Sequence, residues 1–280
     1  MSTPIILSAF LLACEQPDRQ SAMATDDVAE RIVSLSPHLT ELTFAAGAGQ
    51  QLVGVVDYSD YPEAAAAIPR IGDAFRIDYE AISLLNPDLV LAWRGGTSRE
   101  TIERLRSLGY RVVELDAGRL ADITEQLLAI GRLAGTDSAA QVAAAELTSE
   151  ITTLRTRNRD KRPVSVFFQI SAEPLFSVTG KHVISDIIEV CGGRNVFTDL
   201  SGLAPSVDME AVAAANPDVV IAAARQGDTA WMDRWRRLTQ LTAVRLGHLY
   251  SVDRDFISRS GPRIIDGAVE ICDALDKARA

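Results

Sequence analysis

Aromatic and charged side chains gather in the short segments that follow the predicted strands of this chain. Parallel strands deliver such segments to one edge of a sheet, where ligands bind. Aromatic faces with a few polar anchors suit a large, partly flat ligand better than a reacting centre. Any single aromatic residue is also consistent with core packing, so the hypothesis rests on the whole set. Its members are Tyr58, Tyr61, Phe75, Trp93, Arg94, Phe176, Asp255, Phe256 and Arg259.

The sequence motifs of several enzyme classes are absent. The chain has no phosphate-binding loop, no G-x-G-x-x-G turn, no G-x-S-x-G elbow and no H-E-x-x-H motif. The three histidines, His38, His182 and His248, are far apart in sequence, so we expect surface or loop positions and no metal site. A carboxylate pair for glycosyl chemistry stays open, because no spacing marks one. Two classes therefore remain, a binding protein with no catalytic residue and no cofactor, or a two-lobed α/β enzyme such as a glycosyltransferase.

One uninterrupted helix is predicted over residues 136–160. Its apolar positions follow a spacing of four and three residues and form one stripe, Ala140, Ala144, Leu147, Ile151 and Leu154. Threonine, aspartate and serine precede the stripe as N-cap residues, and arginines cluster at the other end. A helix of this length spans about 36 Å. It is predicted to be a strut between two lobes.

Strand and helix patterns alternate on both sides of this helix, which predicts an α/β fold with parallel sheets. Residues 86–92, NPDLVLA, recur 130 positions later as residues 216–222, NPDVVIA. In both copies a helix ends before proline and aspartate opens an apolar strand. We infer a duplication that gives two Rossmann-like lobes, residues 31–135 and 161–280, with a ligand cleft between them.

The amino terminus predicts export. Residues 1–13 contain a short apolar run, too brief to span a bilayer, that resembles a signal peptide. The run ends in Leu11-Leu12-Ala13-Cys14, which resembles a bacterial lipobox with Cys14 as the lipidated residue. The first four residues, MSTP, depart from the signal pattern because they lack lysine and arginine. Residues 14–30 are polar and suit a flexible tether.

The charge and cysteine content of the chain limit the kinds of partner and of cross-link that it can have. A net charge of −10 and a pI near 4.9 argue against nucleic acid as a partner. Besides Cys14, the chain has Cys191 and Cys272. An exported compartment permits a disulfide between them, and two buried thiols are the alternative.

Five stretches carry a family resemblance when they are taken in order. They are RIVSLSPHLTELTFAAG, VGVVDYSDYP, LNPDLVLAWRGG, IIEVCGGRNVF and RSGPRI, within residues 31–264. The chain resembles the substrate-binding proteins of bacterial ABC importers for cobalamin, haem and iron siderophores, and the cobalamin binders above all. The family fold is two α/β lobes bridged by one long helix, and family members are carriers rather than enzymes.

The resemblance also implies roles for particular residues. Tyr58, Trp93 and Phe176 match aromatic contacts to the corrinoid, and Asp255 and Arg259 match polar contacts. Glu41 and Glu189 match a pair of exposed glutamates, one per lobe, that dock on arginines of the membrane permease. Cys191 and Cys272 match positions joined by a disulfide. The implied partners are a corrinoid ligand and the permease and ATPase complex. Together with the lipobox-like sequence before Cys14, this predicts a lipid-anchored monomer on the periplasmic face of a bacterial membrane.

Two departures bear on the ligand. Phe75 and Ala204 stand where the cobalamin binder has pocket tryptophans, which favours an altered corrinoid such as cobinamide or a weaker affinity. Haem is disfavoured because residues 72–76, GDAFR, lack the tyrosine ligand usual in haem binders. A ferric siderophore stays open as the alternative within the family.

Overall fold

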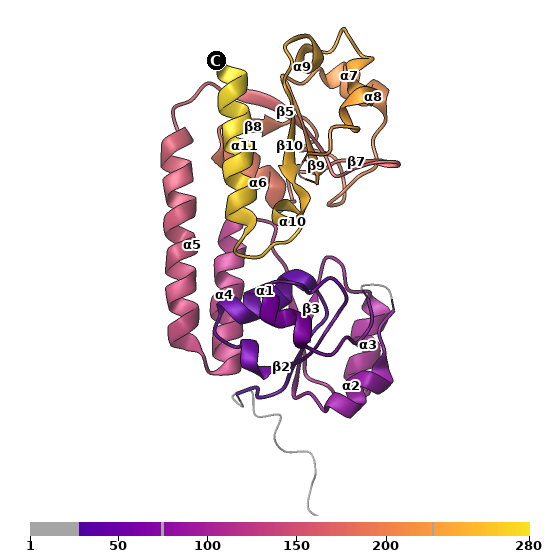
Figure 1. The fold of residues 1–280 in the computed structure, drawn as a ribbon, viewed down its shortest axis with the longest axis vertical. Helices are drawn as coiled ribbons and strands as arrows, with labels where there is room; N and C mark the ends of the chain where they lie inside the picture. The colour runs from indigo at the N-terminus through magenta and orange to yellow at the C-terminus, as the bar shows by residue number, and fades with distance from the viewer. Residues whose placement is uncertain (1–27, 74–75, 226) are drawn as a thin grey trace, which may run out of the picture.

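The computed structural model describes residues 28–73, 76–225 and 227–280. They form two α/β lobes set at the two ends of a pair of long helices (Figure 1). Cys14 and Phe75 lie outside the described residues, so the expectations for these two side chains stay predictions. No helix in the described part of the chain is long and apolar enough to cross a membrane.

The N-terminal lobe contains a four-stranded parallel sheet in the order β2-β1-β3-β4. Helices cover both of its faces, and two 3-10 turns, η1 and η2, flank β2. The elements are β1 (Ile32–Ser34), α1 (Pro37–Ala45), η1 (Gly49–Gln51), β2 (Leu52–Val55), η2 (Glu63–Ala67), α2 (Tyr79–Leu85), β3 (Leu89–Trp93), α3 (Arg99–Ser107) and β4 (Val112–Leu115).

The C-terminal lobe repeats this plan with a parallel sheet in the order β10-β9-β5-β8. A small antiparallel hairpin, β6 and β7, lies beside it. The parallel sheets predicted from sequence are thereby confirmed. The elements are β5 (Val164–Gln169), β6 (Ser171–Ala172), β7 (Leu175–Phe176), α6 (Val183–Val190), β8 (Gly193–Asn195), α7 (Met209–Ala215), β9 (Val219–Ala224), α8 (Met232–Arg236), α9 (Thr242–Arg245), β10 (Leu249–Asp253), α10 (Arg254–Ile257) and α11 (Ile264–Arg279).

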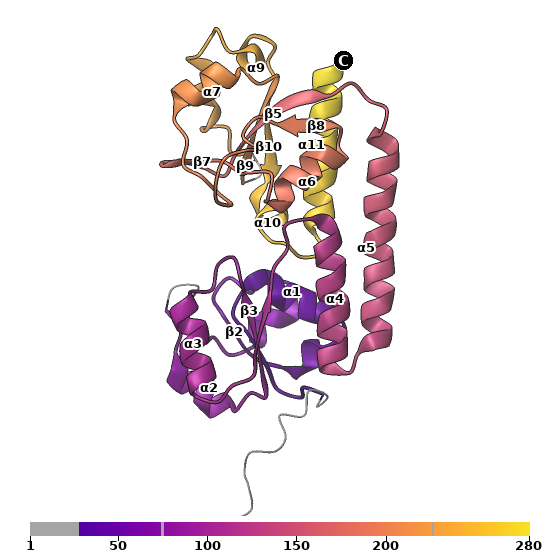
Figure 2. The ribbon, with the colours of Figure 1, turned by 180° about the vertical axis from the view of Figure 1, so that it is seen from behind.

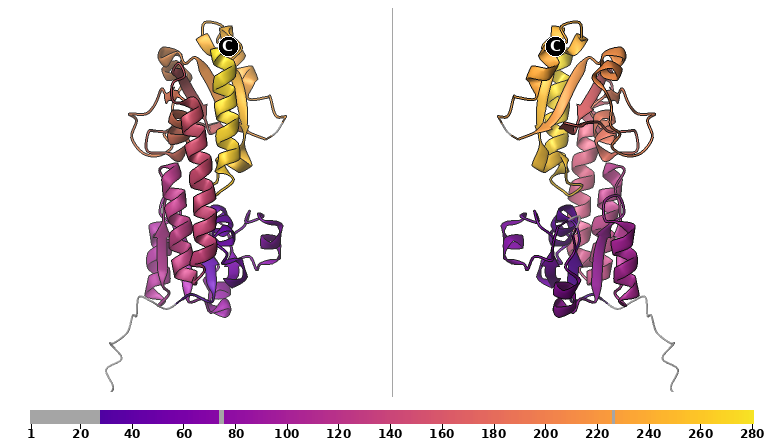
Figure 3. Two further views of the ribbon diagram at one scale, coloured as in Figure 1. Left: turned by 90° about the vertical axis from the view of Figure 1, so that its left-hand side faces the viewer. Right: turned by 90° about the vertical axis from the view of Figure 1, so that its right-hand side faces the viewer.

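Two antiparallel helices bridge the lobes, α4 (Leu120–Ala134) and α5 (Asp137–Asn158) (Figures 2 and 3). The apolar stripe predicted for α5 is confirmed, since all five of its positions are buried. The helix α4 was not among the predicted elements, although its buried residues also recur at helical spacing. The amino end of α4 reaches the other lobe, where the Leu120 amide donates to the Asp186 carboxylate at 2.8 Å. The chain passes from one lobe to the other through α5, as predicted, and α4 packs beside α5 to form a helical hairpin.

The repeated NPD segments occupy equivalent places in the two lobes. Asn86 and Asn216 end α2 and α7 in the left-handed conformation, with φ of 45° and 41°. Asp88 then accepts hydrogen bonds from the start of β1, and Asp218 accepts them from Ser165 at the start of β5. The same turn chemistry thus joins the same pair of strands twice, which supports the inferred duplication.

One cluster of buried residues runs through both lobes. It extends from Ile32 and Leu89 in the first sheet, along Leu147 of α5, to Phe168 and Ile221 in the second sheet. Each lobe has a further cluster on its opposite sheet face, beneath α2 and α3 or beneath α7 and α8. Because the largest cluster is shared, movement of one lobe against the other would expose apolar surface along the bridge.

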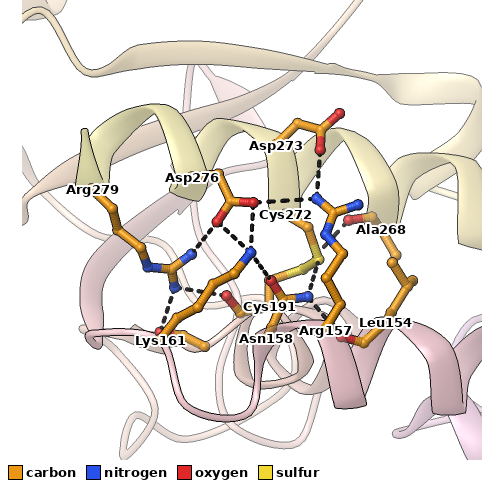
Figure 4. The surroundings of a disulfide bond; sticks show 11 residues. Leu154, Arg157, Asn158, Lys161, Cys191, Ala268, Cys272, Asp273, Asp276 and Arg279 are labelled. Carbon is orange, nitrogen blue, oxygen red and sulfur yellow. Dashed lines mark hydrogen bonds and ion pairs between the residues drawn. A yellow bond between two sulfur atoms is a disulfide. The ribbon is translucent and has the colours of Figure 1, made fainter.

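A disulfide joins α6 to α11 beside the carboxyl end of α5. Cys191 at the end of α6 is bonded to Cys272 of α11, with a Cα–Cα distance of 4.7 Å, which confirms the implied pairing (Figure 4). Asn158 at the end of α5 contacts the Cys272 sulfur at 3.4 Å, and Lys161 reaches Asp276 of α11 at 2.6 Å. Closing a loop of 81 residues stabilises the fold by about 4 kcal/mol on the chain-entropy model.

Candidate functional site

Trp93 is held in place by its own turn. It is the last residue of β3, and its indole folds back over the glycine pair that follows. A Cβ atom on Gly96 would overlap with the indole ring, so glycine is needed where the ring lies against the backbone. The indole Nε1 donates to Asp116 at 3.2 Å. The ring is therefore oriented before any ligand arrives.

His38 lies beside this indole in the first turn of α1. The two rings meet edge to face, with centroids 5.3 Å apart, and Ser36 Oγ lies 2.6 Å from His38 Nδ1. Burial and then the nearby charge of Arg259 lower the pKa of His38 to about 4. His38 is therefore neutral at neutral pH, and the surface or loop position expected for it is wrong. His182 and His248 do lie in loops.

The two lobes meet at Glu41 of α1. Its carboxylate accepts hydrogen bonds from Arg259 Nη1 at 3.0 Å, from Arg263 Nη2 at 2.6 Å and from Arg263 Nε at 3.1 Å. Both arginines come from the segment between α10 and α11, which descends onto α1 (Figure 1). The Glu41 side chain is only 1% exposed, against 14% and 20% for the arginines. The position expected for Glu41, an exposed docking carboxylate, is therefore wrong.

Two more N-lobe residues complete this contact. Asp60 accepts from Arg259 at 2.6 Å, and this hydrogen bond is the main reason why the pKa of Asp60 is lowered. The Arg263 guanidinium lies 3.8 Å from the centroid of the Tyr61 ring, in cation–π geometry. Glu41, Asp60, Tyr61, Arg259 and Arg263 are called the inter-lobe cluster below. Sequence reasoning selected Tyr61 and Arg259 but missed Arg263, four residues from Arg259, and Asp60 beside Tyr61.

The other residues predicted to bind the ligand lie outside the inter-lobe cluster. Tyr58 is 77% exposed and has a φ of 64°, on the loop that also carries Asp60. Arg94 is exposed and lies 3.9 Å from Glu114. Phe256 is half-buried with the Arg263 guanidinium 5.7 Å from its ring, and Asp255 next to it is exposed. Phe176 is half-buried in β7.

Glu189, the second predicted docking residue, is exposed on α6. It lines a hollow with Arg155 of α5 and with Arg159, the residue that follows α5. Glu41 and Glu189 thus do not form a matched pair of exposed carboxylates. Among the described residues, no group of three or more His, Cys, Asp and Glu side chains is arranged to hold a metal ion.

Comparison with known proteins identifies the family. A family model described as periplasmic binding protein matches residues 32–256. The chain belongs to the periplasmic binding protein family. It is accordingly an exported binding protein of the periplasm and not an enzyme, which removes the enzyme alternative.

Several relatives of this binding protein are known. The vitamin B12-binding protein of Vibrio parahaemolyticus is 32% identical over 259 residues, which is 92% of this chain and 93% of that one. The crystal structure of the periplasmic vitamin B12 binding protein of Vibrio cholerae is similar with a TM-score of 0.81 and 31% identity, over 89% of this chain and 98% of that one. A periplasmic haem-binding protein from Roseiflexus is similar with a TM-score of 0.78 and 25% identity, over 90% and 100% of the two chains. The two-lobed fold expected from the resemblance is confirmed.

Replacing the buried carboxylate should weaken the whole fold. In Glu41→Gln the two arginines lose their buried counter-charge, and breaking a buried ion pair from one side is strongly destabilising. We expect the free energy of unfolding to fall by about 2–3 kcal/mol, below the range for a fully buried pair because both guanidinium groups are partly exposed.

Urea unfolding followed by circular dichroism measures this change. Glu150→Gln, at an exposed glutamate of α5, is the matched control and should change stability by less than about 0.5 kcal/mol. Equal effects of the two variants would show that the Glu41 pairs contribute nothing to stability.

Proposed function

We propose that this protein is the substrate-binding component of an ABC importer, which captures cobalamin or a related corrinoid between its lobes and delivers it to the membrane permease. One observation carries the proposal. Trp93 from the first lobe and Arg259 from the second lobe both lie close to His38, one by ring contact and the other by its charge. These are two of the positions that the resemblance assigns to the corrinoid, and they come from segments 166 residues apart. The names of the Vibrio relatives support the same ligand class.

Binding would be physical rather than covalent. The exposed faces of Tyr58, Trp93 and Phe176 would cover the corrin and its side groups, because aromatic rings bury much area with little loss of side-chain entropy. Asp255 and Arg259 would hydrogen-bond side-chain amides of the ligand. Ala204, exposed in the loop before α7, removes an aromatic wall, and this supports a corrinoid with fewer groups on one face, such as cobinamide. Arg94 would line the same edge, and the ligand contact of Phe75 stays a prediction from the sequence.

A titration decides among the ligand classes. Purified protein is titrated with cyanocobalamin, dicyanocobinamide, haemin and a ferric siderophore, and binding is followed by calorimetry. We expect the corrinoids to bind more tightly than the other two ligands. Trp93→Ala should weaken corrinoid binding about thirtyfold, the cost of truncating a central aromatic contact, while Leu84→Ala at an exposed position of α2 should not. Tight binding of haemin or the siderophore without corrinoid binding would assign the protein to another branch of the family.

For the permease contact we propose Glu80 and Glu210. The resemblance implies one exposed glutamate per lobe, and Glu41 is buried. Glu80 and Glu210 lie in the first turns of α2 and α7, each two residues after a capping aspartate, Asp78 or Asp208, and both are exposed. They are 130 residues apart, the spacing of the NPD repeat, and α2 and α7 both lie on the side of the molecule away from α5 (Figure 1). The duplication therefore supplies the matched pair that Glu41 and Glu189 do not form.

Uptake separates docking from ligand capture. The double variant Glu80→Ala with Glu210→Ala should abolish corrinoid uptake by cells that carry the cognate permease, while the Kd for the corrinoid stays within about twofold, because neither side chain touches the inter-lobe cluster. Glu189→Ala is the comparison and should leave uptake intact. If Glu189→Ala alone abolished uptake and the double variant did not, the docking surface would lie on α6 instead.

We further propose that Cys14 carries the lipid and that the protein acts as a monomer held near its permease by residues 14–30. The lipobox-like sequence before Cys14 supports this anchor. Labelled palmitate should enter the full-length protein in cells, and the Cys14→Ser variant should take up none and be released in soluble form. Equal membrane association of both proteins would contradict the anchor.

A further inference from the structure

The inter-lobe cluster has donors but no surplus charge. Two guanidinium groups, Arg259 and Arg263, face two carboxylates, Glu41 and Asp60, and their formal charges cancel. The principal groups that act on the two arginines are these same carboxylates and, for Arg263, Arg259 and Tyr61. His38, which the charge of Arg259 also reaches, has a pKa lowered to about 4 and is neutral at neutral pH. A ligand that reaches Arg259 therefore meets N–H donors on a site whose positive charge is already compensated.

Glu41 is the member of the cluster that a ligand cannot readily displace. It is the most buried of the four charged side chains, and it makes three of the hydrogen bonds. Arg263 donates to both Glu41 carboxylate oxygens in a bidentate pair, the geometry of the stronger arginine–carboxylate pairs. Asp60, by contrast, is 62% exposed and makes one bond. An anionic ligand group beside Arg259 would thus approach a fixed, buried negative charge.

The kind of ligand group that suits such a site follows from its electrostatics. A guanidinium has five N–H donors, and Arg259 bonds both Glu41 and Asp60 through Nη1, so these two bonds leave its Nη2 and Nε donors for a further acceptor. A neutral amide carbonyl can accept one of them without adding charge. A carboxylate in the same place would be repelled by Glu41, and in a partly buried site this repulsion is poorly screened by solvent.

We propose that Glu41 is a specificity-determining residue, which makes the site accept corrinoids with amide side chains and reject ligands of similar shape that carry carboxylates. The inference rests on the proposed corrinoid function and adds the charge class of the ligand. It also distinguishes this site from one that binds haem, with its two propionates, or an anionic siderophore. Glu41 acts through Arg259 and Arg263, and discrimination here works by repulsion of the wrong ligand as well as attraction of the right one.

Two corrins with one ring and different side groups test the proposal. The probes are dicyanocobinamide, whose side chains are amides, and dicyanocobyrinic acid, whose side chains are carboxylates. Calorimetry at one ionic strength and pH 7.5 gives the ratio of their Kd values. We expect the wild-type protein to prefer the amide, and Glu41→Gln, which leaves one uncompensated positive charge, to shift the ratio toward the acid by about tenfold or more.

Charge-compensating variants separate selectivity from loss of structure. Glu41→Gln combined with Arg263→Gln restores the charge balance and should restore the wild-type ratio. Arg263→Gln alone leaves one surplus negative charge and should shift the ratio the other way, which keeps the test valid if Glu41→Gln alone fails to fold. Glu150→Gln, at an exposed position of α5, should leave the ratio unchanged.

The outcomes distinguish this inference from the function on which it rests. If the wild-type protein binds neither corrin, the proposed function fails and the inference fails with it. If dicyanocobinamide binds but the ratio does not follow the charge of the cluster across these variants, Glu41 only ties the lobes together and the specificity role is overturned while the corrinoid function stands.

Discussion

The buried carboxylate of Glu41 bonds two arginines of the opposite lobe, and the polar contact between the lobes depends on this interaction. A carboxylate that is 1% exposed is stable only if its charge is paired and its oxygens accept hydrogen bonds. Here the pairing comes from Arg259 and Arg263, more than 200 residues away in sequence. The contact therefore fixes where the lobes meet and how Arg259 is presented, in one set of bonds.

A second, apolar contact between the lobes runs along α4 and α5. The α4 and α5 hairpin shares one apolar cluster with both sheets, and the disulfide with its surrounding ion pairs holds the end of α5 against α6 and α11. Apolar packing thus joins the lobes along α4 and α5, and charged hydrogen bonds join them at the inter-lobe cluster, while the disulfide closes within the C-terminal lobe between α6 and α11. Two lobes held in this way suit a carrier that closes little around its ligand. Under the proposed function, ligand selection then depends on side chains that are already in place, those at the strand ends and those of the inter-lobe cluster.

The sequence predicted the parts of this structure that depend on local patterns. The buried stripe of α5, the parallel sheets and the equivalence of the NPD segments all follow from residue spacing within short windows. The cysteine pairing followed from the family resemblance and not from spacing. The helix α4 was predictable in the same way, because Leu120, Ile123, Leu127, Ile130 and Ala134 recur at helical spacing and form its buried face.

The candidate site was less predictable because the residues that contact one another in it are distant in sequence. Nothing near Glu41 indicates that two arginines from beyond α10 will bury it, and an isolated helical glutamate is usually exposed. His38 was misplaced for the same reason, since its burial depends on Trp93 and Ser36 together. The proposed docking pair is different, because the repeat that reveals the two lobes also relates Glu80 to Glu210, and that signal is present in the sequence.

The most direct test of the account is the crystal structure of the full binding protein with dicyanocobinamide. The account predicts the corrin between Trp93 and Phe176, a ligand amide within hydrogen-bond distance of Arg259, and Glu41 still bonded to Arg259 and Arg263. A corrin bound elsewhere on the protein, or an Arg259 turned away from the ligand with the Glu41 pairs broken, would contradict it.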